Sequence, residues 1–312
     1  MSQALLAAIR AQPWAILPEY MEAIEAVAVR FLEAPSLEAL RVDGHAERHE
    51  ANLQAIAAMG SPLEGTRRGM IRNGVASLPL FGPIFPRAAS MSLSSGGTSL
   101  DTWAADFRAA ERSEAVNQIL LVVDSPGGVV SSELGAACEL IASARKPVTA
   151  YVAGAGASAA YWMISQAGEI VMDPLSVVGS IGVLSSLSRQ EGPDASGRRT
   201  HDVVSSNAEN KRPNPATPEG RQVIQALVDS LEREFVATVA AGRKTTRETV
   251  LEDFGRGGLL AGKAAVKAGM ADRLDSLEAT LARLSRPAAP AGGSRALAER
   301  EHDMRQRRAR SL

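Results

Sequence analysis

The chain is poor in several residue types, and each shortage narrows what it can be. Among its 312 residues there is one cysteine, Cys138, and aromatic residues make up only 4%. A single cysteine excludes an internal disulfide and fits a reducing compartment. It lies in the helix-like stretch SELGAACELIASAR, where we expect a buried structural thiol. The core must be built mainly from Ala, Val, Leu and Ile.

Long hydrophobic runs and an excess of one charge are also missing. Arg10 and Pro13 interrupt the N-terminal apolar residues, well short of the roughly 18 to 20 needed to span a bilayer. No basic residues precede that run, as they would in a secretory signal. The formal net charge is -1, which gives no overall attraction to nucleic acid or an anionic membrane. We therefore expect a cytoplasmic protein without a membrane partner or a specific nucleic-acid partner.

The hydropathy pattern divides the chain into three parts. Residues 1–70 carry helical spacing with few breakers. Residues 71–284 alternate buried-strand patterns such as QILLVVD, PVTAYVA and EIVMDP with helical ones, which is typical of an α/β fold with largely parallel strands. Residues 285–312 are rich in Ala, Pro and Gly and then basic, so we expect a disordered tail.

The stretch VVDSPGGVVSS is the first candidate for chemistry. A buried strand is expected to end near Asp124 and a helix to start near Ser131, with the two glycines Gly127 and Gly128 between them. Glycines allow unusual backbone dihedrals and leave amide groups uncovered. Such amides can form an oxyanion hole, although an ordinary tight connection has the same composition.

Ser158, in GAGASAAYW, follows the next predicted strand and stands where a helix begins. Ligands of open α/β sheets bind beyond the carboxyl ends of the strands, so Ser158 and Gly128 would lie at the same edge. Two interpretations are open at this point. Ser158 either caps its helix, which serine does well, or it is a nucleophile, which requires a base.

Two bases are available in the sequence. Of the four histidines only His201 lies near the central region, where it could act with Asp173 or Asp202. The other base is Lys211, in the stretch SSNAENKRPNP; a lysine can act as a base when burial favours its neutral form. The histidines and the cysteine offer no spacing typical of metal ligands, so neither a metal nor a cofactor is expected.

Four blocks in order, SPGG, AGASAAYW, VGSIGV and the lysine of ENKRPNP, resemble the signal peptide peptidase A type of serine peptidase. The segment AGKAAVKAGMADRLDSLEATLARL resembles the closing segment of that family, so the resemblance covers roughly residues 70 to 285. It implies a ClpP/crotonase-like spiral of strand–helix units and a Ser–Lys dyad. The lysine segment departs from the usual pattern of the family.

Carried over residue by residue, the resemblance implies a role for each of five positions. Ser158 would be the nucleophile and Lys211 the general base, and Ser180 would hydrogen-bond the lysine. The backbone amides of Gly128 and Ala159 would form the oxyanion hole. The family assembles into rings, so a homo-oligomer is expected.

The N-terminal stretch PWAILPEYMEAI is similar to the phage branch of the family, the capsid maturation or prohead proteases of the lambda head protein C type. That branch implies scaffold, capsid or portal proteins as substrates, in the host cytoplasm or within the prohead. Three alternatives stay open: a soluble housekeeping peptidase that clears signal peptides, a crotonase-type enzyme acting on CoA esters with Glu133 as its carboxylate, and a non-catalytic capsid or scaffold protein.

Overall fold

The computed structural model describes residues 12–33, 51–87, 97–187 and 192–286, with short gaps at 52–53, 56, 59, 194–196, 198, 200 and 202. The predicted C-terminal tail lies almost wholly outside this range. The strands are β1 (Trp14–Ile16), β2 (Ser61–Pro62), β3 (Met70–Arg72), β4 (Val75–Phe81), β5 (Ile84–Phe85), β6 (Thr98–Ser99), β7 (Gln118–Ser125), β8 (Gly127–Val129), β9 (Val148–Ala157), β10 (Glu169–Met172), β11 (Val177–Gly179), β12 (Leu259–Ala261) and β13 (Arg273–Leu274). The helices are α2 (Pro18–Glu33), α5 (Leu100–Arg112), α6 (Ser132–Ala142), α7 (Ala159–Ile164), the 3-10 turn η1 (Glu209–Lys211), α8 (Pro218–Gly242), α9 (Arg247–Asp253), α10 (Gly262–Ala268) and α11 (Leu277–Leu284).

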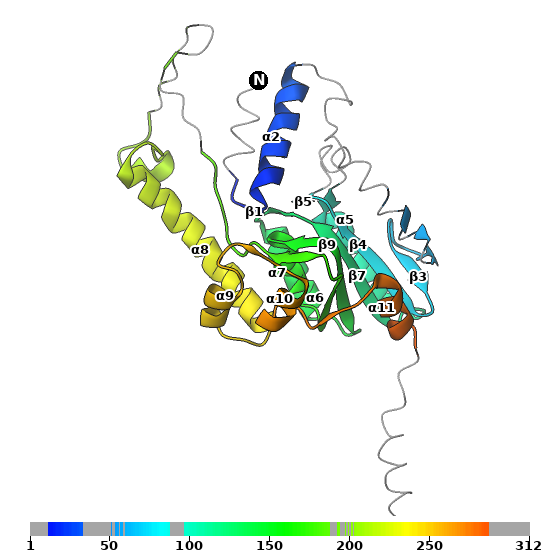
Figure 1. Ribbon diagram of the computed structural model, residues 1–312. Coiled ribbons are helices and arrows are strands. Elements are labelled where there is room, and N and C mark those ends of the chain that lie inside the picture. Colours follow the sequence, from blue (N-terminus) through cyan, green and yellow to red (C-terminus); the bar gives the residue numbers. More distant parts are fainter. Residues whose placement is uncertain are drawn as a thin grey trace, which may run out of the picture.

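A mostly parallel sheet forms the centre of the molecule (Figure 1). Its strands run in the order β12-β11-β9-β7-β4-β3-β2, and β10 pairs with β9 and β13. Strands β4, β7, β9, β10 and β11 are parallel, while β12, β3 and β2 add antiparallel edges. The predicted α/β class is confirmed.

The central strand β7 shows why a continuous apolar run forms a strand here. Its side chains alternate between the two faces of the sheet. Leu121 and Val123 join the main core beneath α5, α6 and α7, whereas Leu120 and Val122 join a second cluster with α11. Both faces are therefore covered, as the run QILLVVD predicts for a parallel strand. Cys138 of α6 is 4% exposed, which confirms the buried thiol.

A second, smaller sheet has the order β1-β8-β5-β6. Its outer strand β1 lies in the part of the sequence predicted to be helical, residues 1–70. Helix α2 agrees with that prediction, but residues 14–16 form a strand because they pair antiparallel with β8. Figure 1 shows α2 rising from the end of β1 and standing away from the central sheet.

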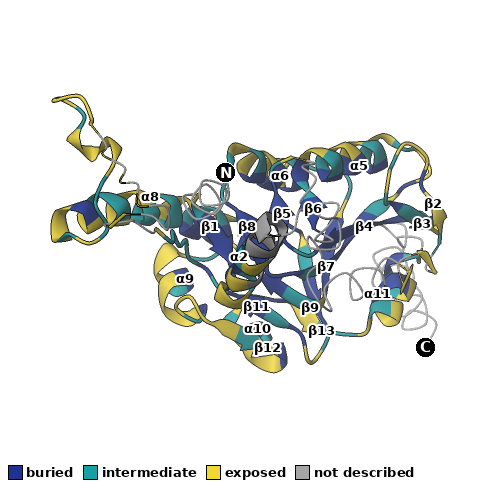
Figure 2. Cartoon of the chain, turned by 90° about the horizontal axis from the view of Figure 1, so that it is seen from above, coloured by how far each residue is buried: buried dark blue, intermediate teal, exposed yellow. Residues whose placement is uncertain are grey.

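Helix α8 is packed along only part of its length. Near its C-terminal end, the side chains of Phe235, Val236, Val239 and Ala240 are buried. Phe235 stacks on Trp162 of α7 with 4.3 Å between the ring centroids. Residues 221–234 of the same helix include no buried side chain. The outer half of α8, with the segment just before it, projects away from the sheets in both views (Figures 1 and 2).

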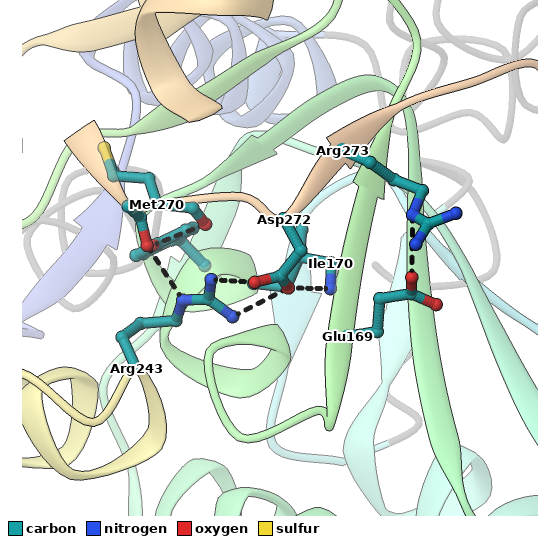
Figure 3. A network of polar contacts seen from close by, with 8 residues as sticks. Glu169, Ile170, Arg243, Met270, Asp272 and Arg273 are labelled. Carbon is teal, nitrogen blue, oxygen red and sulfur yellow. Dashed lines mark hydrogen bonds and ion pairs between the residues drawn. The ribbon is translucent and has the colours of Figure 1, made fainter. Parts of the chain in front are cut away.

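Polar contacts fix the base of this arm (Figure 3). Arg243, directly after α8, forms two hydrogen bonds with Asp272 at 2.7 and 3.1 Å. The Asp272 carboxylate also accepts the amide of Ile170 in β10 at 2.6 Å. Beside it, Glu169 is paired with Arg273 at 2.9 Å and with Arg283 at 2.7 Å. Within the described part of the chain, no helix is long and apolar enough to cross a membrane.

Candidate active site

Ser158 lies between β9 and α7, at the N-cap position of that helix. Its side chain makes no capping hydrogen bond, so the helix-cap interpretation does not explain it. The side chain is 0% exposed, and Oγ has no hydrogen-bond partner among the described residues. The backbone has φ 56° and ψ −120°, a conformation that L-residues rarely adopt. Strain of this kind is concentrated at functional sites.

The turn after β7 approaches Ser158 from the neighbouring strand. The Ser125 hydroxyl donates to the carbonyl of Gly82 at 2.7 Å and accepts the amide of Gly127 at 3.3 Å, which fixes the turn. A Cβ atom built on Gly127 would lie 2.8 Å from the Cβ of Ser158, and one on Gly128 would lie 2.0 Å from the carbonyl oxygen of Ile84. Only glycine fits at either position.

The two amides predicted to form an oxyanion hole, those of Gly128 and Ala159, both lie in elements next to Ser158. Gly128 is the middle residue of β8, beside the turn that touches Ser158. Ala159 opens α7, where a helix leaves its first N–H groups without intrahelical acceptors. The neighbouring amide of Gly127 donates to the Ser125 hydroxyl. The assignment to Gly128 and Ala159 remains a prediction that this arrangement favours.

Ser180 is also brought next to the nucleophile candidate. Strand β11 pairs with the end of β9, with Gly179 opposite Ala157. The amide of Ser158 donates to the carbonyl of Gly179 at 2.7 Å, and Ser180 follows directly with a positive φ of 53°. The Ser158 amide is therefore hydrogen-bonded to the residue directly before Ser180, as the order of the sequence blocks suggests.

Asp124 is a positioning residue that the sequence reasoning passed over. The register between β7 and β9 shifts between Val123 and Ser125, which marks a bulge close to Ser158. The Asp124 carboxylate accepts a hydrogen bond from the amide of Ala155 at 3.0 Å, so this amide at the bulge has an acceptor. Bulges of this kind are over-represented beside active sites. The signal available in the sequence was an aspartate at the end of an otherwise apolar strand.

Lys211 is not brought to Ser158 within one chain. It is exposed, in η1, and the segment just before α8 lies at the outer end of the arm, away from α7 (Figure 1). His201 is exposed in the same part of the chain, and the Asp173 carboxylate accepts the amide of Leu175 at 2.9 Å. Asp202 lies outside the described residues.

Glu133, the carboxylate of the crotonase-type alternative, is tied into the start of α6. It pairs with Arg87 at 3.4 Å. Its own backbone amide and the Ser132 hydroxyl hold the pKa of Glu133 below its usual value, which favours the charged form. Among the described residues, no group of three or more His, Cys, Asp or Glu side chains is arranged to hold a metal ion.

The part of the chain that contains this site is similar to a known peptidase family. Residues 141–289, which include Ser158, Ser180 and Lys211, match peptidase family S49. The chain carries a peptidase family S49 domain. This agrees with the resemblance found in the sequence blocks.

Proteins of bacteria and phages are among those similar to the chain. The chain is 31% identical over 192 residues to Protease 4 of Salmonella typhi, covering 60% of this chain and 31% of that protein. It is 27% identical over 250 residues to capsid assembly protease C of Escherichia phage lambda, covering 74% of this chain and 56% of the relative. It is 30% identical over 207 residues to head-tail preconnector protein GP5 of Enterobacteria phage P21, covering 65% and 41%. The chain thus spans less than two thirds of each of these relatives.

Proposed function

We propose that this protein is a serine endopeptidase in which Ser158 is the nucleophile and Lys211 the general base. The observation that carries the proposal is the Ser158 hydroxyl, which is fully buried without a hydrogen-bond partner on a strained backbone. An unpartnered buried hydroxyl destabilises the fold, by roughly 1–3 kcal/mol. A reacting group that must be free to attack a substrate accounts for keeping it.

The proposed reaction needs only groups of the protein and water. Neutral Lys211 takes the hydroxyl proton as Ser158 Oγ adds to the peptide carbonyl carbon. The amides of Gly128 and Ala159 bind the oxyanion, each typically worth about 3 to 4 kcal/mol. Lys211 then protonates the leaving amine as the C–N bond breaks, and water hydrolyses the ester by the same route. A protonated lysine cannot accept a proton, so the rate falls as the pH is lowered.

The position of Lys211 adds a requirement. Because it is exposed on the arm, the dyad forms only when the segment before α8 moves toward α7 or when a second copy supplies its lysine. The partly unburied arm suits the second arrangement. This supports the proposal of a homo-oligomer, in the form of a ring that confines proteolysis.

The substrate proposal follows the phage relatives. Two of them are named as a capsid assembly protease and a head-tail preconnector protein. We infer that this chain cleaves scaffold, capsid or portal proteins during phage head maturation, in the host cytoplasm or within the prohead. A soluble housekeeping peptidase is the second reading, because Protease 4 of Salmonella typhi is also similar.

Hydrolysis of fluorescein-labelled β-casein, an unfolded protein, tests the chemistry. The wild type should release fluorescent peptides, and Ser158→Ala and Lys211→Ala should each release at least 1,000-fold fewer, as expected for loss of a nucleophile or its base. Lys244→Ala, which removes another lysine beyond α8, is the matched control and should retain activity. Casein hydrolysis that persists in Ser158→Ala would overturn the proposal; a wild type that leaves casein intact would favour the capsid structural protein.

Mixing the two inactive chains shows whether Lys211 reaches Ser158 of its own chain or Ser158 of a second copy. If Lys211 acts on a second copy, Ser158→Ala and Lys211→Ala chains refolded together recover part of the activity. If Lys211 acts within its own chain, the mixture stays inactive. Coexpression with candidate capsid and scaffold proteins, followed by mass spectrometry, then identifies the cleaved bonds.

A further inference from the structure

The inference concerns what occupies the groove beside Ser158. Strand β1 lies between β8 and residue 184. It pairs antiparallel with β8 on one side, with Ala15 opposite Gly128. On its other side, Trp14 donates to the carbonyl of Leu184 at 2.9 Å and accepts the amide of Leu184 at 2.8 Å. A segment from the start of the chain is therefore held at both edges, as an extended peptide would be.

The register points the carbonyl of Ala15 at the predicted oxyanion hole. Val130 donates to the carbonyl of Pro13 at 3.0 Å, and Leu17 donates to the carbonyl of Pro126 at 3.0 Å. These bonds lie two residues to either side of the Ala15–Gly128 pair. Bonded pairs alternate in an antiparallel ladder, so Ala15 and Gly128 form the bonded pair between them, with the Gly128 amide facing the Ala15 carbonyl.

The same carbonyl lies beside the nucleophile. A Cβ built on Gly127 would lie 2.2 Å from the Ala15 oxygen and 2.8 Å from the Ser158 Cβ, so both flank one face of Gly127. Ser158 is 0% exposed, and a substrate cannot reach a fully buried hydroxyl. The segment that covers it must leave before any other peptide can bind.

The side chains of the segment alternate between two environments. Ala15 belongs to the main core, where Ser158 and α7 lie, and is 1% exposed. Trp14 and Ile16 point the other way, into a small separate cluster with Phe85 and Val129. The site beside Ser158 thus takes a small residue, with a large apolar residue before it and another after it.

The attachment of this segment is limited. Of the side chains described in α2, only Met21 and Ile24 are buried, and both belong to the same small cluster. A hollow of about 300 Å³ separates α2 from residues 184–187. Figure 1 shows α2 standing above the sheets, away from the helices beside the central sheet. Of residues 13–17, only Ala15 belongs to the main core, so separation of the segment removes one small side chain from that core.

We propose that residues 13–17 are an internal substrate mimic that occupies the peptide-binding groove on the edge of β8, with Ala15 in the place of the residue whose carbonyl Ser158 attacks. The proposal rests on the proposed peptidase function for the role of Ser158. It names the substrate class as extended segments with a small residue between two large apolar ones. In the intact chain the segment competes with such substrates.

Peptide binding tests the groove without any catalysis. The probe is a fluorescein-labelled peptide with the sequence of residues 11–19, AQPWAILPE, measured by anisotropy with chains that carry Ser158→Ala. The double variant Trp14→Ala/Ile16→Ala has a weakened segment, so the probe should bind it at least tenfold more tightly than the chain with an intact segment. Leu251→Ala, on the exposed face of α9 and outside this cluster, is the control and should bind like the intact chain. A probe with Arg in place of Ala15 should bind none of them.

Equal binding by the intact and substituted chains, or equal binding of the Arg probe, overturns the inference. If the double variant does not fold, Ala15→Arg within the chain is the second variant, because it expels the strand and leaves Trp14 and Ile16 unchanged. With Ser158 present, casein hydrolysis should also become at least tenfold faster when the segment is weakened. Binding as expected with casein intact in every chain would reject the peptidase function and retain the groove assignment.

Cleavage of the unlabelled peptide between its Ala and Ile residues would also support the mimic. In that reaction the Ser158 hydroxyl adds to the Ala carbonyl carbon. The C–N bond then breaks, the hydroxyl proton passes through the base to the Ile nitrogen, and water hydrolyses the ester. Cleavage at any other bond would contradict the proposed register.

Discussion

At the scale of single residues, the strained backbone and the uncovered hydroxyl of Ser158 are two costs at one position. The positive φ of a non-glycine residue costs about 1–3 kcal/mol, and the hydroxyl loses its hydration without gaining a partner. Neither feature can be read from GAGASAAYW, because helix capping is the commoner use of serine before a helix. The sequence does indicate the position, through the strand and helix on either side of it.

Substitution of Ser158 should therefore stabilise the protein while abolishing its activity. We expect Ser158→Ala to be at least as stable as the wild type, because it removes an unpartnered buried hydroxyl. Ser158→Gly should be more stable than Ser158→Ala by about 1–3 kcal/mol, because glycine adopts φ 56° without strain. Thermal unfolding by calorimetry checks this order. An unfolding temperature of Ser158→Gly at or below that of Ser158→Ala would contradict the strain.

The glycine turn gives the second prediction at this scale. Gly128→Ala should destabilise the fold by about 1–3 kcal/mol or more, because its Cβ would lie 2.0 Å from the backbone oxygen of Ile84. Gly135→Ala in α6 is the matched change, since its Cβ meets nothing within 4 Å. It should stabilise the helix by about 0.5–1 kcal/mol. Urea unfolding of both variants measures the difference. Equal free energies of unfolding for Gly128→Ala and Gly135→Ala would show that the turn shifts to make room for the added Cβ.

At the scale of elements, the hydropathy pattern predicts the strands and helices whose own residues determine their structure. The runs around Leu121 and Ala150 are apolar throughout and become β7 and β9, and the helices α6, α7 and α8 also form where their spacing indicates. Strand β1 was missed because three residues after Pro13 carry no periodicity, and only pairing with β8 makes them a strand. The same reason explains why the sequence could not place Lys211: the polar stretch before α8 has no pattern that fixes its position.

The anchor of α8 has a predictable pH dependence. Burial opposes the charged form of Asp272, but the hydrogen bonds from Arg243 and from the Ile170 amide outweigh it and lower the pKa of Asp272 below its ordinary value of 3.8. This pair therefore stabilises the fold at neutral pH and loses its effect as the pH falls through the lowered value. Asp272→Asn should cost about 1–2 kcal/mol at pH 7, because the carboxylate is partly exposed.

Denaturant unfolding at several pH values tests this anchor. The difference in the free energy of unfolding between the wild type and Asp272→Asn should be largest at pH 7 and should shrink below about pH 4. Asp253→Asn, at the exposed end of α9, should change stability by less than about 0.5 kcal/mol at every pH. A difference for Asp272→Asn that stays constant down to pH 2 would mean that packing, and not the ion pair, holds the arm.

At the scale of the whole molecule, the proposed mechanism gives two segments control of the active site. The segment containing β1 pairs with β8 beside Ser158, and the segment before α8 lies at the outer end of the arm, away from α7 (Figure 1). The main core takes only Ala15 from the first segment and no residue from the outer half of α8. Under this proposal the ends of β7, β9 and β11 form one part of the site, and the other two parts have to be rearranged or supplied before it can work.

The outer half of α8 predicts how the second part is supplied. Its apolar residues Ile224, Leu227 and Leu231 continue the stripe that is buried at Phe235, yet Leu227 is 57% exposed in the single chain. An apolar stripe of this kind is expected to pack on another copy of the chain. The wild type should therefore sediment as an oligomer, and Leu227→Asp should shift it toward single chains, because a charge on the stripe must be desolvated in the contact.

Sedimentation velocity of the wild type, Leu227→Asp and Ser230→Asp over a range of concentrations decides this point. Ser230 is exposed on the same helix, off the apolar stripe, so Ser230→Asp should sediment like the wild type. If oligomers supply Lys211 to Ser158 of a neighbouring copy, Leu227→Asp should lose casein hydrolysis in parallel with assembly. Retained assembly in Leu227→Asp, or a wild type that sediments as single chains at every concentration, would require Lys211 to reach Ser158 by movement of its own arm.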